Sequence, residues 1–120
     1  MTKNTTAVGN TAEDMAAEYL QSKGYRVIAR NHRTRFAELD IIAANKDVIV
    51  FVEVKYRKYA QFGGGAGAIT QDKLRRLRNA AEVWLSEHEE YIRHQPRIDA
   101  ITAEGDLTAL RIEHLENIGH

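Results

Sequence analysis

Three charged residues, Asp40, Glu53 and Lys55, stand in or beside two strongly apolar segments, residues 39–44 and 48–54. An ionised side chain buried in such a segment costs free energy unless it is paired with an opposite charge or binds a metal. Glu53 and Lys55 are two residues apart, so on a β-strand their side chains point to the same face. Two carboxylates and an ammonium brought together could carry out metal-dependent hydrolysis of a phosphodiester bond.

The position of Asp40 relative to Glu53 depends on the turn between the two apolar segments. Asn45-Lys46-Asp47 is a turn-like sequence between two strand-like runs, which predicts a β-hairpin. Asp40 shares the face of Glu53 and Lys55 only if it pairs near an odd-numbered residue, 51 or 53. A loop of two or four residues gives that register, whereas a three-residue loop does not. We therefore predict a loop with an even number of residues.

Two carboxylates at such a site would repel each other, and the pKa of one of them would rise. A divalent cation bound by Asp40 and Glu53 removes this conflict, and an oxygen-only ligand set favours Mg²⁺ or Mn²⁺ over Zn²⁺. The backbone carbonyl of Val54 could add a further oxygen ligand. Lys55 could orient or help to deprotonate an attacking water molecule, or stabilise negative charge on the phosphoryl group. The alternative is a plain ion pair of Lys55 with Glu53 or Asp40, which leaves excess negative charge.

Length and composition describe an ordinary globular chain. Its 120 residues suit a single domain, residues 1–120, and a hydrophobic fraction of 43% is typical of globular proteins. The absence of cysteine excludes disulfides and thiolate metal sites. No apolar run approaches the ~20 residues of a membrane span, and residues 1–10 lack the apolar core of a signal peptide. We expect a cytoplasmic protein that does not bind membranes, with a flexible tail over residues 1–9.

The net charge of zero conceals an uneven distribution of charged residues. Basic residues dominate residues 23–35 and 54–80, whereas residues 81–120 hold nine acidic and three basic residues. If the basic segments share a face, they create a positive field suited to DNA phosphates; the alternative is ordinary solvated surface. The candidate nucleic-acid-binding residues are Arg26, Arg30, Arg33, Arg35, Arg57, Lys58, Arg75, Arg76 and Arg78.

The order of predicted elements is typical of an α/β domain. Apolar residues at helical spacing predict helices over residues 11–23 and 70–89, the second capped by Thr70. The glycine-rich segment 59–68 does not match a phosphate-binding loop and is either a mobile flap or a linker. The predicted strands are residues 25–30, 38–43, 48–56, 96–103 and 107–115, with a turn at 104–106. We predict a single domain with a central mixed sheet of about five strands flanked by helices, in the order α-β-β-β-α-β-β.

Two further acidic residues stand at informative positions. Glu13 lies in the first turn of the predicted first helix, where an acid usually serves as a capping-box residue. Asp99 lies inside the apolar pattern of the strand at residues 96–103, so it is another carboxylate in a segment that should be buried. The sequence pattern alone assigns neither residue to the candidate metal site.

The pattern around the three charged residues resembles a known nuclease signature. Asp40, Glu53 and Lys55 match the D-x(n)-E-x-K motif of the PD-(D/E)xK nuclease superfamily. The wider sequence resembles the YraN-like family of bacterial, endonuclease-like proteins over about residues 8–118, and archaeal-type Holliday-junction resolvases are structural relatives of that family. The matching parts are Glu38–Ala43, Phe51–Arg57, Asn31-His32-Arg33, Gln71, Lys73 and the helix that carries Glu13.

The resemblance implies a restriction-endonuclease-like fold, a Mg²⁺ or Mn²⁺ cofactor and DNA as the substrate. It implies that Asp40 and Glu53 are the metal ligands and that Lys55 is the catalytic lysine. It further implies Glu13 as an additional acid at the site, and Gln71 or Lys73 as an accessory group. The chain departs from the family pattern at Ala37 and at Ala12-Glu13, where the family usually has Gly and Gly-Glu, and at Ile98-Asp99-Ala100, where it usually has Phe-Asp-Val.

Three functional hypotheses follow from the sequence. The first is a divalent-metal-dependent endonuclease acting on DNA, including branched or damaged forms. The second is a catalytically silent nucleic-acid-binding module on a nuclease fold, although the intact Asp40, Glu53 and Lys55 disfavour it. The third is an interaction protein that uses its acidic residues 81–120 as a partner surface. A homodimer is compatible with the first hypothesis, since nucleases that cut two strands often pair.

Overall fold

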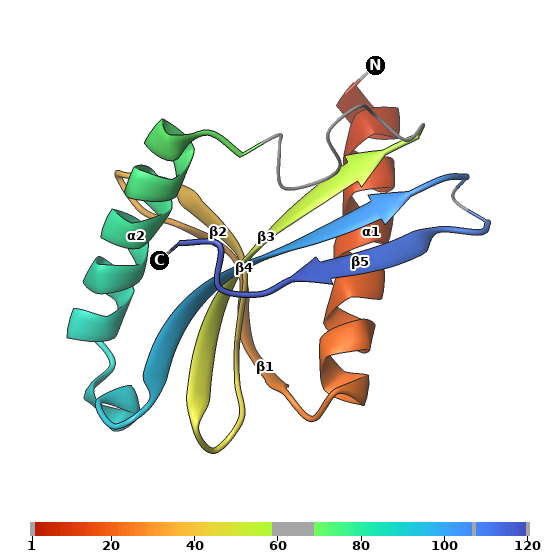
Figure 1. Cartoon of the computed structure of the whole chain (residues 1–120). Coiled ribbons are helices and arrows are strands. Elements are labelled where there is room, and N and C mark those ends of the chain that lie inside the picture. The colour runs from red at the N-terminus through yellow and green to blue at the C-terminus, as the bar shows by residue number, and fades with distance from the viewer. Residues whose placement is uncertain (1, 59–68, 107, 120) are drawn as a thin grey trace.

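The computed structural model describes residues 2–58, 69–106 and 108–119, and the side chains of these residues from Thr11 onward. The predicted flap or linker at residues 59–68 therefore lies outside the described residues. The elements in chain order are α1 (Thr2–Ser22), β1 (Arg26–Arg33), β2 (Glu38–Ala44), β3 (Val48–Arg57), α2 (Gln71–Ser86), the short 3₁₀ helix η2 (Glu89–Tyr91), β4 (Gln95–Glu104) and β5 (Arg111–Leu115). This single α/β domain confirms the predicted fold class and element order (Figure 1).

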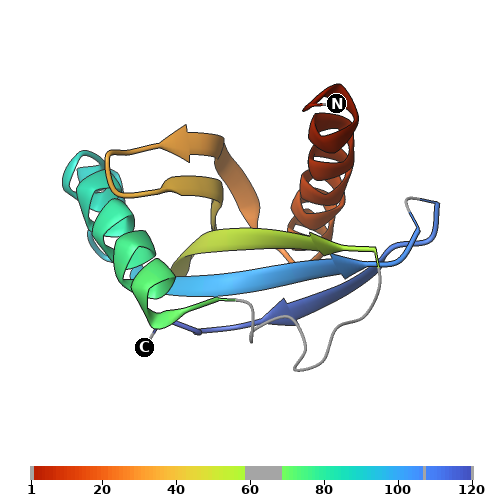
Figure 2. The ribbon, with the colours of Figure 1, turned by 90° about the horizontal axis from the view of Figure 1, so that it is seen from above.

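The five strands form one mixed sheet in the order β1-β2-β3-β4-β5. Only β3 and β4 pair in parallel, and α2 lies in the connection between them; the other neighbouring strands are antiparallel. The two helices lie on either side of the sheet in Figure 1. Seen from above in Figure 2, the β1–β2 hairpin curves away from the plane of β3, β4 and β5.

Strand β3 separates two hydrophobic cores because both of its faces are covered. Ile49 and Phe51 belong to the cluster packed under α2, which we call the α2 core. Val50 and Val52 belong to the cluster packed under α1, which we call the α1 core. Trp84 of α2 contacts Phe51 edge-on with ring centroids 5.8 Å apart. The alternation along β3 therefore predicts which helix any β3 side chain faces: Glu53 continues the series of Phe51, toward α2.

The helix boundaries agree with the sequence at one end of each helix. Thr70 caps α2 as predicted, since its hydroxyl accepts a hydrogen bond from the Lys73 backbone N–H at 3.1 Å. However, α2 ends at Ser86 rather than at residue 89, because the acidic residues that follow oppose the helix dipole. Gly24 has a φ of 93° and ends α1 as predicted.

The predicted start of α1 at residue 11 is wrong, because the helix begins at Thr2. Residues 2–10 contain no proline, so nothing forces a helix boundary at residue 11 and the helix can propagate toward the N-terminus. The expectation that residues 1–9 form a flexible tail stays a prediction, because a helical backbone does not report mobility. Neither helix in the described part of the chain is long and apolar enough to cross a membrane.

Two strand boundaries also differ from the prediction. Strand β1 continues to Arg33, beyond the predicted end at residue 30. Strands β4 and β5 pair antiparallel, so they form the predicted hairpin, but β5 starts at Arg111 rather than at residue 107 and the connection is longer than the predicted turn at residues 104–106. The physical reason is that β4 stays attached to β3: Arg57 pairs with Glu104, and the Gly105 N–H donates to the Arg57 carbonyl at 3.0 Å.

Candidate active site

The β2–β3 hairpin has the register that the site requires. The turn is fixed by Asn45, whose side-chain oxygen accepts hydrogen bonds from the N–H groups of Asp47 and Val48 at 2.9 and 2.8 Å. The paired residues then run from Ala44↔Ile49 to Ile41↔Val52. One further step along this register places Asp40 opposite Glu53. The predicted even-numbered loop is therefore confirmed.

The β2–β3 ladder ends just where Asp40 and Glu53 would pair. Instead of a backbone carbonyl, the Asp40 carboxylate accepts the hydrogen bond of the Val54 N–H, with Oδ2 at 2.9 Å. The N–H and C=O of one strand residue point to the same edge of the strand. The Val54 carbonyl therefore faces the same gap as the Asp40 carboxylate, as the proposed third oxygen ligand must.

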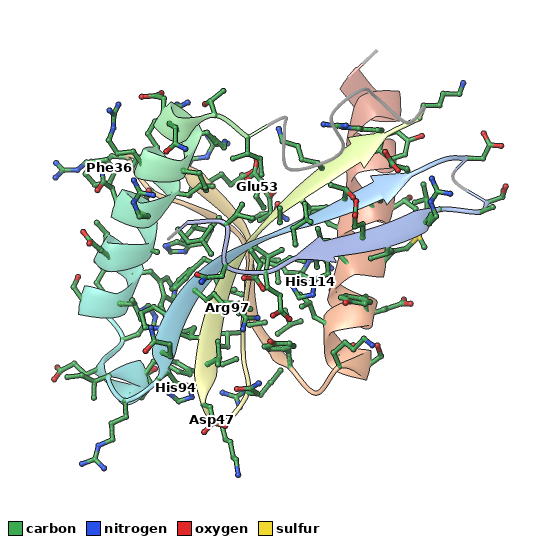
Figure 3. The ribbon with its side chains drawn as sticks, in the orientation of Figure 1. Phe36, Asp47, Glu53, His94, Arg97 and His114 are labelled. Atoms are coloured by element: carbon green, nitrogen blue, oxygen red, sulfur yellow. The ribbon has the colours of Figure 1, made fainter. Side chains whose placement is uncertain are left out.

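Glu53 is almost fully buried, with 5% of its surface exposed. Its Oε2 lies 3.7 Å from the Nζ of Lys55 on the same strand and 3.7 Å from the Nζ of Lys73 on the first turn of α2. Figure 3 shows Glu53 on β3, at the end of the sheet where α2 begins. The structure thus brings together Asp40, Glu53 and Lys55 as predicted and adds Lys73, one of the two accessory residues that the family resemblance implied.

The surroundings of the Asp40 carboxyl disfavour its charged form. Burial, followed by the negative charge of Glu53, raises the pKa of Asp40 from 3.8 to about 7, although the hydrogen bond from Val54 acts in the opposite direction. The charges of Glu13 and Glu38 raise this pKa further. Within the described residues no cation forms an ion pair with Asp40. A divalent cation could therefore take the place of the proton on this carboxyl.

This pKa shift predicts that Asp40→Asn stabilises the metal-free protein at alkaline pH. Between pH 3.8 and about 7 the folded protein keeps a proton on Asp40 that the unfolded chain has lost, so wild-type stability falls as the pH rises through this window. Asparagine keeps an oxygen for the Val54 N–H but carries no charge. We expect the variant to gain on the order of 1–3 kcal/mol relative to wild type at about pH 8 and much less at about pH 4. Urea unfolding in a chelator at the two pH values measures this, and a variant less stable than wild type at the higher pH would contradict it.

Glu13 of α1 lies near the site and forms an ion pair with Arg30. Its Oε1 lies 3.5 Å from Nη2 of Arg30, which also donates a 2.8 Å hydrogen bond to Asp14. Within the described part of the chain, Glu13 Oε1 is a buried atom with no hydrogen-bond partner. Because α1 begins at Thr2, Glu13 is an interior helix residue, and the capping-box interpretation is wrong. Its influence on the pKa of Asp40 agrees with the implied place beside the site.

In the described part of the chain, Gln71 has no hydrogen bond or ion pair with Asp40, Glu53 or Lys55. It is the exposed first residue of α2. Lys73, two residues later, points to Glu53 instead. The structure thus favours Lys73 over Gln71 as the accessory group, while the role of either residue stays a prediction.

The basic residues of β1 and the β1–β2 turn divide between two ends of the sheet. Arg26 lies opposite Ala44, near the far end of the hairpin, and donates to the Tyr91 hydroxyl at 2.9 Å. Arg33 lies 3.6 Å from Glu38, and Arg35 stacks on Phe36 with its guanidinium carbon 4.8 Å from the ring centroid. Phe36 in turn packs against the α2 core and lies beside α2 in Figure 3. These basic residues therefore do not share one face.

The basic residues of β3 and α2 differ in their accessibility. Arg57 is buried, with 8% exposure, whereas Lys58 is exposed. Arg75 and Arg76 are exposed and both pair with Asp72. Arg78 donates to the Gly119 carbonyl at 3.2 Å. Arg75 and Arg76 follow Lys73 on the same helix. They are therefore the exposed arginines of α2 that lie closest in sequence to the site, and their side chains are accessible to a ligand.

Sequence reasoning left Asp99 unassigned, and the structure places it in a second buried network. Asp99 is fully buried; Arg97 donates to its two oxygens at 2.9 Å, and His114 Nε2 lies 2.7 Å from Oδ2. Burial alone would raise the pKa of Asp99, but hydrogen bonds from His114, Arg97 and the Asn117 N–H outweigh burial and lower it. Asp99 pairs in register with Val52 of the α1 core, so it faces away from Glu53. Its partners satisfy its charge without a metal.

Sequence reasoning assigned no role at the site to two residues that the structure places near it. Asp14 holds Arg30 beside Glu13, and Asn31 has a positive φ of 53° next to Arg30 on β1. The Asp14–Arg30 contact joins residues of α1 and β1, and a contact between elements has no sequence spacing that predicts it. At position 31 the indications were the residue type, since asparagine tolerates positive φ better than most residues, and its place in a segment that matches the family.

The donor atoms at Asp40, Glu53 and Val54 fit a hard divalent cation. Within the described residues, no group of three or more His, Asp or Glu side chains is arranged to hold a metal. Zinc sites normally need such a group, whereas Mg²⁺ is often bound by one or two carboxylates and keeps several water molecules for substrate phosphates to replace. Two neighbouring carboxylates, with the Val54 carbonyl directed into the gap beside Asp40, agree with the second kind of site.

Comparison with known proteins assigns the chain to a family. Residues 12–103 match the model of the family described as "Uncharacterised protein family UPF0102". A UPF0102 protein from Mycolicibacterium vanbaalenii is 41% identical over 124 residues, which cover 98% of this chain and 97% of that protein. A UPF0102 protein from Pseudomonas putida is 39% identical over 113 residues, covering 93% of this chain and 92% of that protein.

Among solved structures, SfsA from Pyrococcus furiosus in complex with Ca²⁺ matches with a TM-score of 0.39 and 17% sequence identity. The match covers 93% of this chain and 63% of that chain, so it spans less than two thirds of SfsA. At this TM-score the likeness supports no conclusion about function. The family assignment rests on the sequence matches, which agree with the resemblance to the YraN-like family: the chain belongs to the family UPF0102.

Proposed function

We propose that this protein is a Mg²⁺- or Mn²⁺-dependent nuclease that hydrolyses phosphodiester bonds in DNA. The observation that supports it most is the convergence of Asp40 and Glu53 at the point where the β2–β3 ladder ends, with Lys55 on the same face. A buried pair of carboxylates with one raised pKa is costly to maintain without a ligand. A divalent cation would relieve that cost and serve the chemistry.

In this proposal Asp40, Glu53 and the Val54 carbonyl hold the cation. When bound, the cation polarises the phosphoryl group and lowers the pKa of a water molecule. Lys55 and Lys73, each 3.7 Å from Glu53 Oε2, supply positive charge to stabilise the negative charge that develops on the phosphoryl oxygens. Lys55 also orients the attacking water molecule. Glu13, held by Arg30, adds a further acid at the rim of the site.

DNA would lie across the β1–β2 turn and the first half of α2, where exposed basic residues flank the carboxylates. Arg33 and Arg35 stand on the turn, and Arg75 and Arg76 stand on the helix. Such residues contact backbone phosphates and carry no sequence information by themselves. The substrate preference is then set by the shape of the DNA, which agrees with the expectation of branched or damaged DNA.

This surface predicts that the double variant Arg75→Ala/Arg76→Ala weakens DNA binding without changing metal binding. Each lost phosphate contact should reduce the slope of log affinity against log salt by about one, and affinity should fall for all sequences alike. Fluorescence anisotropy over a series of salt concentrations measures this slope. Lys46→Ala, in the exposed β2–β3 turn at the opposite end of the hairpin, is the matched control. An unchanged slope in the double variant would show that DNA binds elsewhere.

A cleavage assay on linear, nicked and four-way-junction DNA tests the proposed activity. We expect cutting that requires Mg²⁺ or Mn²⁺, is abolished by a chelator, and is lost in both Asp40→Asn and Glu53→Gln. Cutting that survives unchanged in either variant would exclude this site as the nuclease centre. Glu87→Gln, at an exposed acid beyond the end of α2, should cut as wild type does.

One observation favours the catalytically silent DNA-binding module as the second candidate. The two lysines beside Glu53 neutralise its charge without a metal, so the ion-pair alternative is also compatible with the geometry. This candidate predicts salt-sensitive DNA binding with no dependence on metal and no cutting. Calorimetric titration with Mn²⁺ distinguishes the two candidates. A nuclease should show a heat of Mn²⁺ binding that is lost in Asp40→Ala, whereas the silent module should show no heat of binding.

A further inference from the structure

Asn31 has a backbone conformation that strands rarely contain. Its φ is 53°, in the left-handed region, although it lies inside β1 (Arg26–Arg33). Non-glycine residues seldom adopt positive φ, and Asn is among the few that tolerate it. The Asn31 side chain is exposed and forms no hydrogen bond in the described part of the chain. The distinctive property of this residue is therefore its backbone.

The distorted residue lies directly across from Asp40. The β1–β2 pairing includes Arg30↔Ile41 and His32↔Leu39 and omits the pair between them, Asn31 and Asp40. A residue with positive φ turns its strand locally, so the pair is lost although the register is the same on both sides of Asn31; the register shift of this pairing lies between Val27 and Ala29. The interruption thus falls on the residue that supplies one of the two site carboxylates.

The side chains on either side of Asp40 in β2 show that this strand is also rotated locally. In a regular strand, residues three apart face opposite sides of the sheet. Leu39 and Ile42 are three apart, yet both belong to the α2 core, whereas Ile41 belongs to the α1 core. Strand β2 therefore rotates between Leu39 and Ile41, which is the position of Asp40.

The rotation explains the unusual contact of the Asp40 side chain. Regular strand side chains stand perpendicular to the sheet and do not reach the backbone of the next strand. Asp40 instead points into the gap where the β2–β3 ladder has ended after Ile41↔Val52, and its carboxylate accepts the Val54 N–H at 2.9 Å. Without this carboxylate the Val54 N–H would face the gap with no backbone acceptor from β2.

We propose that Asn31 is a positioning residue for the site: its left-handed backbone turns the β1–β2 hairpin at Asp40 and delivers the Asp40 carboxylate to the Val54 N–H beside Glu53. The importance of this for metal binding rests on the proposed nuclease function. The contact itself belongs to the metal-free protein and can be measured there. A residue that cannot adopt positive φ should therefore withdraw Asp40 from Val54.

Amide hydrogen exchange in three variants tests this inference. Asn31→Gly keeps access to positive φ and should preserve slow exchange of the Val54 amide. Asn31→Val is β-branched, and we expect it to accelerate Val54 exchange by about tenfold or more, while Val50, which stays paired with Ala43, keeps its wild-type rate. Asn31→Ala should fall between the two and replaces the valine variant if that one does not fold. Mn²⁺ affinity should follow the same order.

A matched control separates backbone conformation from the mere presence of valine in an exposed strand. Arg33→Val changes an exposed residue of the same strand whose φ is negative, and it should leave Val54 exchange unchanged. Unaltered Val54 exchange in Asn31→Val, or equal acceleration in Asn31→Gly and Asn31→Val, would overturn the inference. If Val54 responds as expected but the wild type neither binds Mn²⁺ nor cuts DNA, the positioning role stands and the proposed function fails.

Discussion

Replacing Glu53 by Gln should reduce metal-dependent DNA cleavage by at least about 10²–10³-fold, the usual effect of removing one preorganised electrostatic group from an active site. Glutamine has the shape of glutamate but lacks the charge that binds a cation and that attracts Lys55 and Lys73, both 3.7 Å from Oε2. Single-turnover cleavage of the best DNA substrate measures the effect. Affinity for DNA in a chelator should change far less, because the basic residues on the β1–β2 turn and α2 are untouched.

The stability of this variant distinguishes a catalytic defect from a folding defect. Glu53 is 5% exposed and its Oε2 has two cationic neighbours, so its replacement also leaves two half-buried lysines without their partner. The cleavage rate must therefore be compared at a temperature where both proteins are fully folded. A folded Glu53→Gln protein that cuts DNA at the wild-type rate would contradict the assignment of Glu53 as a metal ligand.

The largest loss of stability should come from Asp99, on the other face of the sheet. Asp99→Ala removes a buried charge whose partners are Arg97, His114 and the Asn117 N–H, and it leaves the Arg97 guanidinium half-buried without its main acceptor. Breaking a buried ion pair from one side costs about 3–5 kcal/mol. Urea unfolding at neutral pH measures the difference. The exposed variant Glu113→Ala on β5 should lie close to wild type.

The pH dependence gives a second, independent test of the Asp99 network. The pKa of Asp99 is lowered in the folded protein, so the ionised carboxylate stabilises the fold above its ordinary pKa, and this contribution is lost as the pH falls through the folded value. The stability difference between wild type and Asp99→Ala should therefore shrink under strongly acidic conditions. The folded variant should bind Mn²⁺ as wild type does; loss of Mn²⁺ binding at temperatures where it is folded would show that the two networks are coupled.

The fold and the central carboxylates were predictable because they depend on short-range rules. The apolar runs around residues 45–47 identify a hairpin, and a side-chain period of two leaves only two possible faces for Asp40. The requirement that both carboxylates share a site then selected the correct register, Ile41↔Val52. The order of helices and strands followed from apolar periodicity in the same way.

The parts that sequence could not supply depend on contacts between distant elements. Asp40 and Asp99 look alike in sequence, since each is a carboxylate in an apolar strand, yet one lacks an ion-pair partner in the described chain and the other has Arg97 and His114. Only the packing of β5 against β4 brings His114 to Asp99. Likewise, Arg30 was expected to bind phosphate, but α1 places Asp14 beside it.

The two buried carboxylates have opposite effects on the stability of the fold. The Asp99 network on the α1 side satisfies its own charge and lowers the pKa of its carboxyl, which is the behaviour of a stabilising element. The Asp40 carboxyl in the gap between β2 and β3 has its pKa raised to about 7 by burial and by Glu53, so its charged form destabilises the metal-free fold. Neutralising Asp40 should stabilise the protein and neutralising Asp99 should destabilise it.

A crystal structure of the wild-type protein grown with Mn²⁺ tests directly whether Asp40 and Glu53 bind a divalent cation. The metal is identified by its anomalous scattering, independently of any assay of activity. We expect an anomalous peak between the carboxylates of Asp40 and Glu53, within bonding distance of the Val54 carbonyl, and no such peak in Asp40→Asn. Ordered carboxylates with no anomalous density between them at saturating Mn²⁺ would contradict it.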